Sequence, residues 1–155
     1  LHALYEVGES DRAWRVLLAM LCGPDPAECL QRGQLPVFVP NYYRGAWRQH
    51  PRTAGRSSQL FNTGTAAWMY RCLVESLFGL RGEGDGVRIA PQLPAHWPNA
   101  RAVRRFRGAE LAVEIERVAG LPASRVSVDG RVLEDAVLAP IEAGRRYAVR
   151  VELPA

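Results

Sequence analysis

Small polar residues begin the segment SSQLFNTGTAAWMYRCLVESLFGL, which covers residues 57–80. Hydroxyl groups, an amide and a glycine precede an apolar-faced stretch that is typical of a helix. Such groups can hold an anion, because the free N–H groups of a helix start and the positive end of its dipole point the same way. Alternatively, Asn62 or Thr63 caps the helix and no ligand is involved. The segment alone favours this simpler interpretation.

Aromatic and arginine side chains are combined just upstream of this segment. Tyr42, Tyr43 and Trp47 lie beside Arg44 and Arg48. Aromatic faces next to guanidinium groups suit stacking against a sugar or contact with an acidic ligand. Packing of an aromatic loop on the helices explains the same pattern equally well, so both interpretations stay open.

A third arginine-rich run occupies positions 101–107, where Arg101, Arg104, Arg105 and Arg107 are interleaved with apolar residues. Such a run can bind nucleic acid. Here the charges alternate with core positions and glutamates follow at once, which favours a solvated strand face. We therefore expect no nucleic-acid partner.

The chain shows no residues arranged for catalysis or for metal binding. No Ser/His/Asp order and no pair of carboxylates stands out, so we assign no catalytic residue to it. Cys22, Cys29 and Cys72 lack metal-ligand spacing, and the histidines are scattered. We expect buried free thiols in a reducing compartment, a cytoplasmic protein and no bound metal.

Composition sets further bounds. The 155 residues carry a net charge of +4, and every one of the 20 cationic residues is arginine. No apolar run approaches the ~20 residues that span a bilayer, so we expect no membrane partner. LHALYEV at the start is helical in character without a capping residue, which leads us to expect a segment of a longer protein.

Helical periodicity dominates the chain up to about Gly82. One helix is predicted from Ser10, as its N-cap, with Asp11 in the first turn and Gly23 ending it; its apolar face is Ala13, Trp14, Leu17, Leu18 and Leu21. A longer helix is predicted over residues 65–78, with Gly79 at its end. Its predicted buried face is Ala67, Tyr70, Val74, Leu77 and Phe78.

Beyond Gly82 the sequence alternates in the manner of short strands. Two stretches have clear period-2 alternation, and Asp129-Gly130 is a signal for a tight hairpin. Several short strands with turns at this spacing predict an antiparallel β-sandwich. The alternating apolar residues are Leu111, Val113 and Ile115 in one stretch and Tyr147, Val149 and Val151 in the other.

Three motifs in a fixed order resemble a known family. They are TGTAAW, the block LFGLRGEGDGVRIAPQLPAHW and the turn FRG, and the segment SDRAWRVLLAML is similar to a further helix of that family. Together they resemble the C-terminal part of the inverting glycoside phosphorylases. That group includes cellobiose, cellobionic acid and chitobiose phosphorylases and the phosphorylase-like domain of cyclic β-1,2-glucan synthases.

The resemblance implies an α+β multidomain fold. Residues 1–81 would be the closing helices of an (α/α) six-hairpin barrel, the catalytic domain, and residues 82–155 a C-terminal antiparallel β-sandwich domain. It also implies an enzyme that cleaves a β-glucoside with phosphate and inversion and releases α-glucose 1-phosphate. Inorganic phosphate is then a substrate, no cofactor is expected, and a homodimer is expected.

The resemblance assigns phosphate binding to Thr63 and Gly64. Ser57, Ser58 and Thr65 are weaker candidates around them. The general-acid Asp of the family lies upstream, so we expect this segment to be inactive alone.

The arginines of the loop favour an acidic acceptor such as that of cellobionic acid, with cellobiose and related glucans as other possibilities. The alternative function is a non-catalytic module for carbohydrate binding or assembly. Sugar-contact candidates are Tyr42, Tyr43, Arg44 and Arg48.

Overall fold

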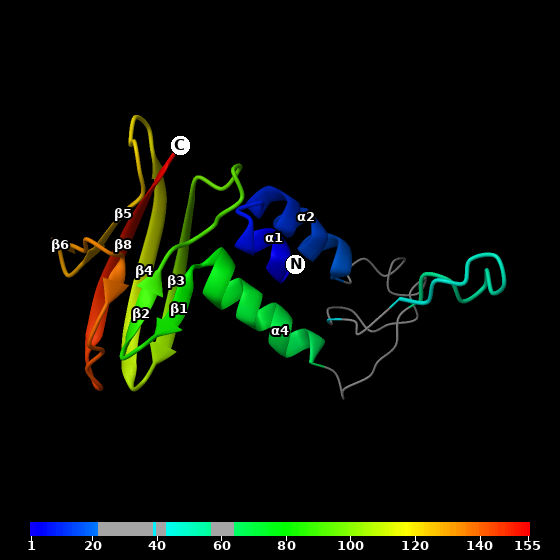
Figure 1. Cartoon of the computed structure of the whole chain (residues 1–155), viewed down its shortest axis with the longest axis horizontal. Helices are drawn as coiled ribbons and strands as arrows, with labels where there is room; N and C mark the ends of the chain where they lie inside the picture. The colour runs from blue at the N-terminus through cyan, green and yellow to red at the C-terminus, as the bar shows by residue number, and fades with distance from the viewer. Residues whose placement is uncertain (22–38, 40–42, 57–63) are drawn as a thin grey trace.

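The structure is a computed structural model that describes residues 1–21, 39, 43–56 and 64–155. Within these residues, three α-helices lie on one side of two β-sheets (Figure 1). They are α1 (His2–Glu6), α2 (Ser10–Met20) and α4 (Thr65–Cys72), and a π-helical turn, η1 (Leu73–Leu77), continues α4. No helix in the described part of the chain is long and apolar enough to cross a membrane.

Helix α2 starts differently from the sequence prediction. Its N-cap is Glu9, Ser10 is already helical, and no side chain caps the first turn. The predicted Ser10 cap is therefore wrong by one residue. The Asp11 carboxylate instead accepts a hydrogen bond from the backbone N–H of Ala95 at 2.8 Å. This bond joins the first turn of α2 to the segment that precedes the second sheet.

The buried face of α2 is narrower than the sequence predicts. Ala13 and Leu17 are buried and Trp14 is half-buried, but Leu18 is 51% exposed. Leu18 is rotated about 100° from Leu17 around the helix axis. The prediction for Leu18 is wrong because the elements packed against α2 cover only the side that carries Ala13 and Leu17.

The helix predicted over residues 65–78 is present, but its last turn is wider than an α-turn. The N–H of Phe78 donates to the carbonyl of Leu73, five residues back, at 2.9 Å, which is the hydrogen bond of a π-turn. Gly79 follows with a φ of 63°, the left-handed conformation that glycine adopts after a helix. The predicted end of the helix is confirmed.

The π-turn changes which side of α4 is buried. Ala67 and Tyr70, predicted to be buried, are exposed, Tyr70 by 68%. Five residues make about one turn of π-helix but about 1.4 turns of α-helix. Cys72 therefore lies above Leu77, and both are buried. The predicted face is confirmed for Leu77, and Val74 and Phe78 are half-buried against the core. It is wrong for Ala67 and Tyr70, because α-helical spacing does not hold through η1.

Two β-sheets share one hydrophobic core with the helices. The first sheet has the order β1–β2–β7 and the second β3–β4–β8–β5–β6. Helices followed by two sheets confirm the predicted α+β class, while the barrel and the boundary at residues 81 and 82 stay predictions. The strands are β1 (Leu80–Glu83), β2 (Gly86–Ile89), β3 (Asn99–Phe106), β4 (Ala109–Val118), β5 (Arg125–Val128), β6 (Arg131–Val132), β7 (Val137–Leu138) and β8 (Arg146–Pro154).

Two hairpins turn on pairs of left-handed residues. Arg107 and Gly108, with φ of 51° and 79°, join β3 to β4, and Asp129 and Gly130, with φ of 50° and 82°, join β5 to β6. Two consecutive positive φ angles define the type I′ turn, whose twist matches that of the strands it connects. The hairpin predicted at Asp129-Gly130 is confirmed.

The central strands β4 and β8 run parallel, which corrects the prediction of a wholly antiparallel fold. The chain leaves this sheet for β7 of the other sheet and re-enters beside β4 from the same end. The predicted apolar faces of both strands are confirmed as buried. In register, Leu111 lies opposite Tyr147, Val113 opposite Val149, and Ile115 opposite Val151.

Arg117 on β4 fastens the segment at residues 93–98 and the end of β8 to the second sheet. Its guanidinium donates to the carbonyls of Trp97 at 3.1 Å, Pro154 at 2.7 Å and Leu93 at 3.1 Å. The Trp97 ring in turn packs edge-on against Trp14 of α2, with ring centroids 4.9 Å apart. This chain of contacts sets the position of the helices on the sheets.

Replacing Arg117 by methionine is expected to lower the free energy of unfolding by about 3 kcal/mol, because several half-buried carbonyls lose a charged donor. Urea unfolding followed by circular dichroism measures it. Arg131→Met, at an exposed position on β6, is the matched control, with an expected change within about 0.5 kcal/mol. A similarly small change in the free energy of unfolding of both variants would contradict the stabilising role of the Arg117 hydrogen bonds.

Candidate phosphate site and its surroundings

Gly64 is the N-cap of α4, so the helix begins one residue later than a cap at Thr63 predicts. Its carbonyl accepts the first helical hydrogen bond, from the N–H of Trp68 at 2.8 Å. Glycine has no side chain, so the N-cap residue itself supplies no hydrogen bond to the first-turn N–H groups. The N–H groups at the start of a helix are the groups that can bind an anion.

Trp68 lies directly over Gly64, a neighbour that the sequence interpretation missed. A Cβ atom at Gly64 would come within 3.3 Å of the indole Cδ1. The indole is 57% exposed, and the Arg71 guanidinium lies 5.5 Å from its ring centroid. The motif TGTAAW contains the signal for this contact, because Trp68 follows Gly64 by four residues, about one helical turn. An exposed aromatic face therefore flanks the start of α4.

The loop at residues 43–56 is closed by its own backbone. The N–H of Arg44 donates to the carbonyl of Arg56 at 2.9 Å, and that of Gly55 to the carbonyl of Arg44 at 2.8 Å. Tyr43 donates its hydroxyl to the carbonyl of Met20 at 2.9 Å, which fixes the loop to the end of α2. For Tyr43, this contact favours loop packing over sugar contact.

Unlike the Tyr43 hydroxyl, the arginine side chains of this loop form no hydrogen bond within the described part of the chain. Arg44, Arg48, Arg52 and Arg56 are exposed, and residues 43–56 contain no Asp or Glu. None of the four forms an ion pair with a residue that the structure describes. Four positive charges thus remain available on one loop.

Several predicted site residues lie outside the described residues. These are Thr63, Ser57, Ser58 and Tyr42, as well as the thiols Cys22 and Cys29. Thr65, the first residue of α4, is described and half-buried. Cys72 is a buried free thiol, as predicted, and burial is the main cause that raises its pKa. Among the described residues, no His, Cys, Asp or Glu side chains gather in a group that could hold a metal ion.

The arginine-rich face of the second sheet is neutralised by glutamates across the strands. Arg101 pairs with Glu114 at 3.3 Å, and Arg105 and Arg146 both pair with Glu110, at 3.9 and 3.2 Å. Arg104 differs, because it turns inward and donates to the Leu80 carbonyl. The predicted solvated strand face is confirmed for Arg101 and Arg105, and these charges already have partners in the protein.

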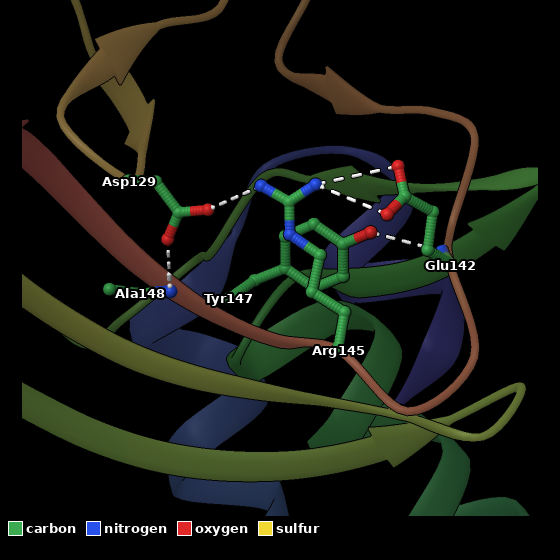
Figure 2. Close-up of polar contacts among 5 residues, drawn as sticks. All are labelled: Asp129, Glu142, Arg145, Tyr147 and Ala148. Atoms are coloured by element: carbon green, nitrogen blue, oxygen red, sulfur yellow. Dashed lines mark hydrogen bonds and ion pairs between the residues drawn. The ribbon is translucent and has the colours of Figure 1, made fainter.

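A second polar group, drawn in Figure 2, holds the β5–β6 turn against the start of β8. Arg145 donates to Asp129 at 3.0 Å and to Glu142 at 3.3 Å, and its guanidinium lies 4.6 Å from the Tyr147 ring centroid. The Tyr147 hydroxyl accepts a hydrogen bond from the Glu142 N–H at 3.0 Å. Asp129 also accepts from the N–H of Ala148 at 2.9 Å. Each polar group has a partner, so the arrangement is structural.

The pKa of Asp129 is lowered from its ordinary 3.8, first by the hydrogen bond from Ala148 and then by that from Arg145. A carboxyl with a lowered pKa in the folded state stabilises the fold above the unfolded pKa, and this stabilisation is lost as the pH falls through the folded pKa. We expect the melting temperature of Asp129→Asn to lie below that of the wild type at neutral pH and to converge with it as the pH falls through the lowered pKa of Asp129. A difference in melting temperature that stays constant with pH would show that the charge of Asp129 does not stabilise the fold.

The sequence of this chain is similar to those of known proteins. No family profile matches the chain. It is 50% identical over 155 residues to the cellobionic acid phosphorylase of Neurospora crassa, which covers 99% of this chain. It is 36% identical over 149 residues to the 3-O-β-D-glucopyranosyl-β-D-glucuronide phosphorylase of Paenibacillus borealis, covering 94% of this chain. Along nearly its whole length, the chain is homologous to a part of the glycoside phosphorylases.

The chain spans about a fifth of the length of those relatives, 20% of the first and 19% of the second. A third relative, the cyclic β-(1,2)-glucan synthase NdvB of Rhizobium meliloti, is 36% identical over 83 residues, which are 54% of this chain and 3% of the synthase. The family resemblance carried by TGTAAW and the motifs after it is confirmed.

Proposed function

We propose that the protein containing this chain is a phosphorolytic glycosyltransferase. It cleaves a β-glucosidic bond with inorganic phosphate, inverts the anomeric carbon and releases α-glucose 1-phosphate. The observation that carries this proposal is the 50% identity, along 99% of the chain, to a cellobionic acid phosphorylase. The chain supplies part of the phosphate site and no catalytic acid, so the chain alone is expected to be inactive.

In this reaction the segment needs only to bind the phosphate and to orient it toward the anomeric carbon. An inverting glycosidase uses one carboxylic acid and one base that activates water. Phosphate is already a nucleophile, so the acid suffices and neither a cofactor nor a metal is required. Thr63 offers a hydroxyl and Gly64 a backbone N–H to the phosphate. The position of Gly64 as the N-cap of α4 supports this role, because the N–H groups at a helix start can bind an anion.

We propose an acceptor sugar that carries a carboxylate. Two relatives are named for such substrates, cellobionic acid and a glucuronide. The four exposed arginines at positions 44–56 support the proposal, because guanidinium groups bind carboxylates in bidentate geometry. Arg44 and Arg48 are the candidates for this contact, with cellobiose and β-1,2-linked glucans as the competing neutral substrates.

The remaining features of the protein are proposals of the same kind. Residues 1–81 would close an (α/α) six-hairpin barrel, and residues 82–155 would form a β-sandwich domain beside it. The two sheets around one core support the sandwich. We further propose a cytoplasmic homodimer.

Phosphorolysis by the full-length protein tests the function. Cellobionic acid, the glucosyl glucuronide, cellobiose and sophorose are each incubated with phosphate, and release of glucose 1-phosphate is measured. We expect the acidic disaccharides to be cleaved with the highest kcat/KM. Binding of these sugars without any glucose 1-phosphate would support a non-catalytic carbohydrate-binding module instead.

A further inference from the structure

A polar cavity of about 210 Å³ lies between α1, the η1 turn and the first sheet. The residues that matter for its chemistry come from distant parts of the chain: Tyr5, Arg71, Arg81, Arg88 and Gln92. Among the described residues proposed to bind the substrates of phosphorolysis, Gly64 and Thr65 at the start of α4 do not line the cavity, and neither do Tyr43, Arg44 and Arg48.

Two residues that line this cavity each have a buried polar atom without a partner among the described residues. The Tyr5 side chain is 2% exposed, and its hydroxyl forms no hydrogen bond with any described residue. The same holds for Oε1 of Gln92, whose backbone is fixed by a hydrogen bond from its N–H to the Leu77 carbonyl at 3.1 Å. Buried polar groups without partners are rare because they cost free energy. A bound group that both accepts and donates hydrogen bonds would satisfy them.

The protonation of Tyr5 decides which way its hydrogen bond runs. Burial is the main cause that raises the pKa of Tyr5 to about 12. The hydroxyl therefore keeps its proton at neutral pH and can donate, whereas Oε1 of Gln92 can only accept. A bound group with one accepting oxygen and one O–H group would satisfy both atoms.

The ion pairs around the cavity leave one arginine, Arg81, without a salt bridge of its own, although its charge contributes to the lowered pKa of Glu83, which pairs with Arg88. Arg71 pairs with Glu75 at 2.8 Å, and Arg88 pairs with Glu83. Arg81 forms neither a hydrogen bond nor an ion pair with any residue in the described part of the chain. Its guanidinium supplies a positive charge, and His2, the other basic residue at the cavity, lies 3.7 Å from Glu6.

We propose that this cavity binds a small oxyanion that retains a proton, such as hydrogen phosphate. One anionic oxygen pairs with Arg81, a second accepts from the Tyr5 hydroxyl, and the protonated oxygen donates to Oε1 of Gln92. Sulfate has similar size and charge but carries no proton at neutral pH. It therefore leaves Gln92 without a donor and binds more weakly.

Isothermal titration calorimetry of the full-length protein with phosphate, and separately with sulfate at equal ionic strength, tests the proposal. We expect a phosphate-binding event in the cavity that Arg81→Gln weakens tenfold or more, since a charge-assisted bond is lost. Tyr5→Phe should weaken it as well. Arg131→Gln removes an exposed arginine with the same change of charge and should leave it unaltered.

Kinetic measurements distinguish phosphate binding in the cavity from phosphate binding at the substrate site. Arg81→Gln should leave the KM for phosphate in phosphorolysis unchanged, and Thr63→Val should leave binding in the cavity unchanged. Unchanged phosphate binding in Arg81→Gln would overturn the proposal, as would equal affinity for sulfate and phosphate. A failure of phosphorolysis by the wild type would count against the proposed function only.

Discussion

Replacing Thr63 by valine in the full-length protein is expected to raise the KM for phosphate roughly 10- to 100-fold. A hydrogen bond to a charged group contributes about 1.5–3 kcal/mol, and each 1.4 kcal/mol is a factor of ten in affinity. Valine keeps the shape of threonine but lacks the hydroxyl donor. The KM for the disaccharide should change little, because the lost bond is made to phosphate alone.

Initial rates at varied phosphate and at saturating disaccharide measure this effect. Thr53→Val is the matched control, because the Thr53 hydroxyl donates within its own loop to the His50 carbonyl at 3.4 Å. Its KM for phosphate should stay at the wild-type value. If Thr63→Val has the phosphate dependence of the wild type, the assignment of Thr63 to the phosphate site is wrong.

Replacing Gly79 by alanine is expected to destabilise the fold by about 4 kcal/mol or more, a large part of the roughly 5–15 kcal/mol by which proteins are ordinarily stable. A Cβ atom at Gly79 would overlap the backbone of Ala90 and Pro91. The φ of 63° adds strain for any residue with a side chain. The Gly79 carbonyl also accepts from the N–H of Ala90 at 2.8 Å, so the two segments cannot separate without losing this bond.

Gly120→Ala separates the steric part of this effect from backbone strain. Gly120 has a φ of 76°, similar to that of Gly79, but its Cβ would meet no atom within 4 Å. We expect a loss of only about 1 kcal/mol there, from strain alone. Soluble yield and urea unfolding of both variants are the measurements. Equal losses in the two variants would show that the contact with Ala90 does not matter.

Features that depend on local chemistry were predictable from the sequence. The period-2 alternation of Leu111, Val113 and Ile115 fixes which side of β4 is apolar, and that side is buried. Asp129-Gly130 tolerates two positive φ angles and forms the predicted hairpin. These signals act within a few residues, so they do not require knowledge of the fold.

Features that depend on distant partners were not predictable in this way. Leu18 belongs to the apolar stripe of α2 but has no neighbour to cover it, and the π-turn moved the buried side of α4 from Tyr70 to Cys72. The parallel pairing of β4 with β8 depends on where the chain re-enters the sheet. Arg117 looks like any other strand arginine until its carbonyl acceptors are seen.

For the functional residues the division is similar. The order and spacing of TGTAAW and the motifs after it are enough, by themselves, to identify the phosphorylase family and to nominate Thr63 and Gly64. Only the tertiary structure shows that the Tyr43 hydroxyl donates to the Met20 carbonyl and so holds its loop to α2. Only the fold places Tyr5, Arg81 and Gln92 around one cavity, because residues so far apart in the sequence meet through packing, which no local pattern records.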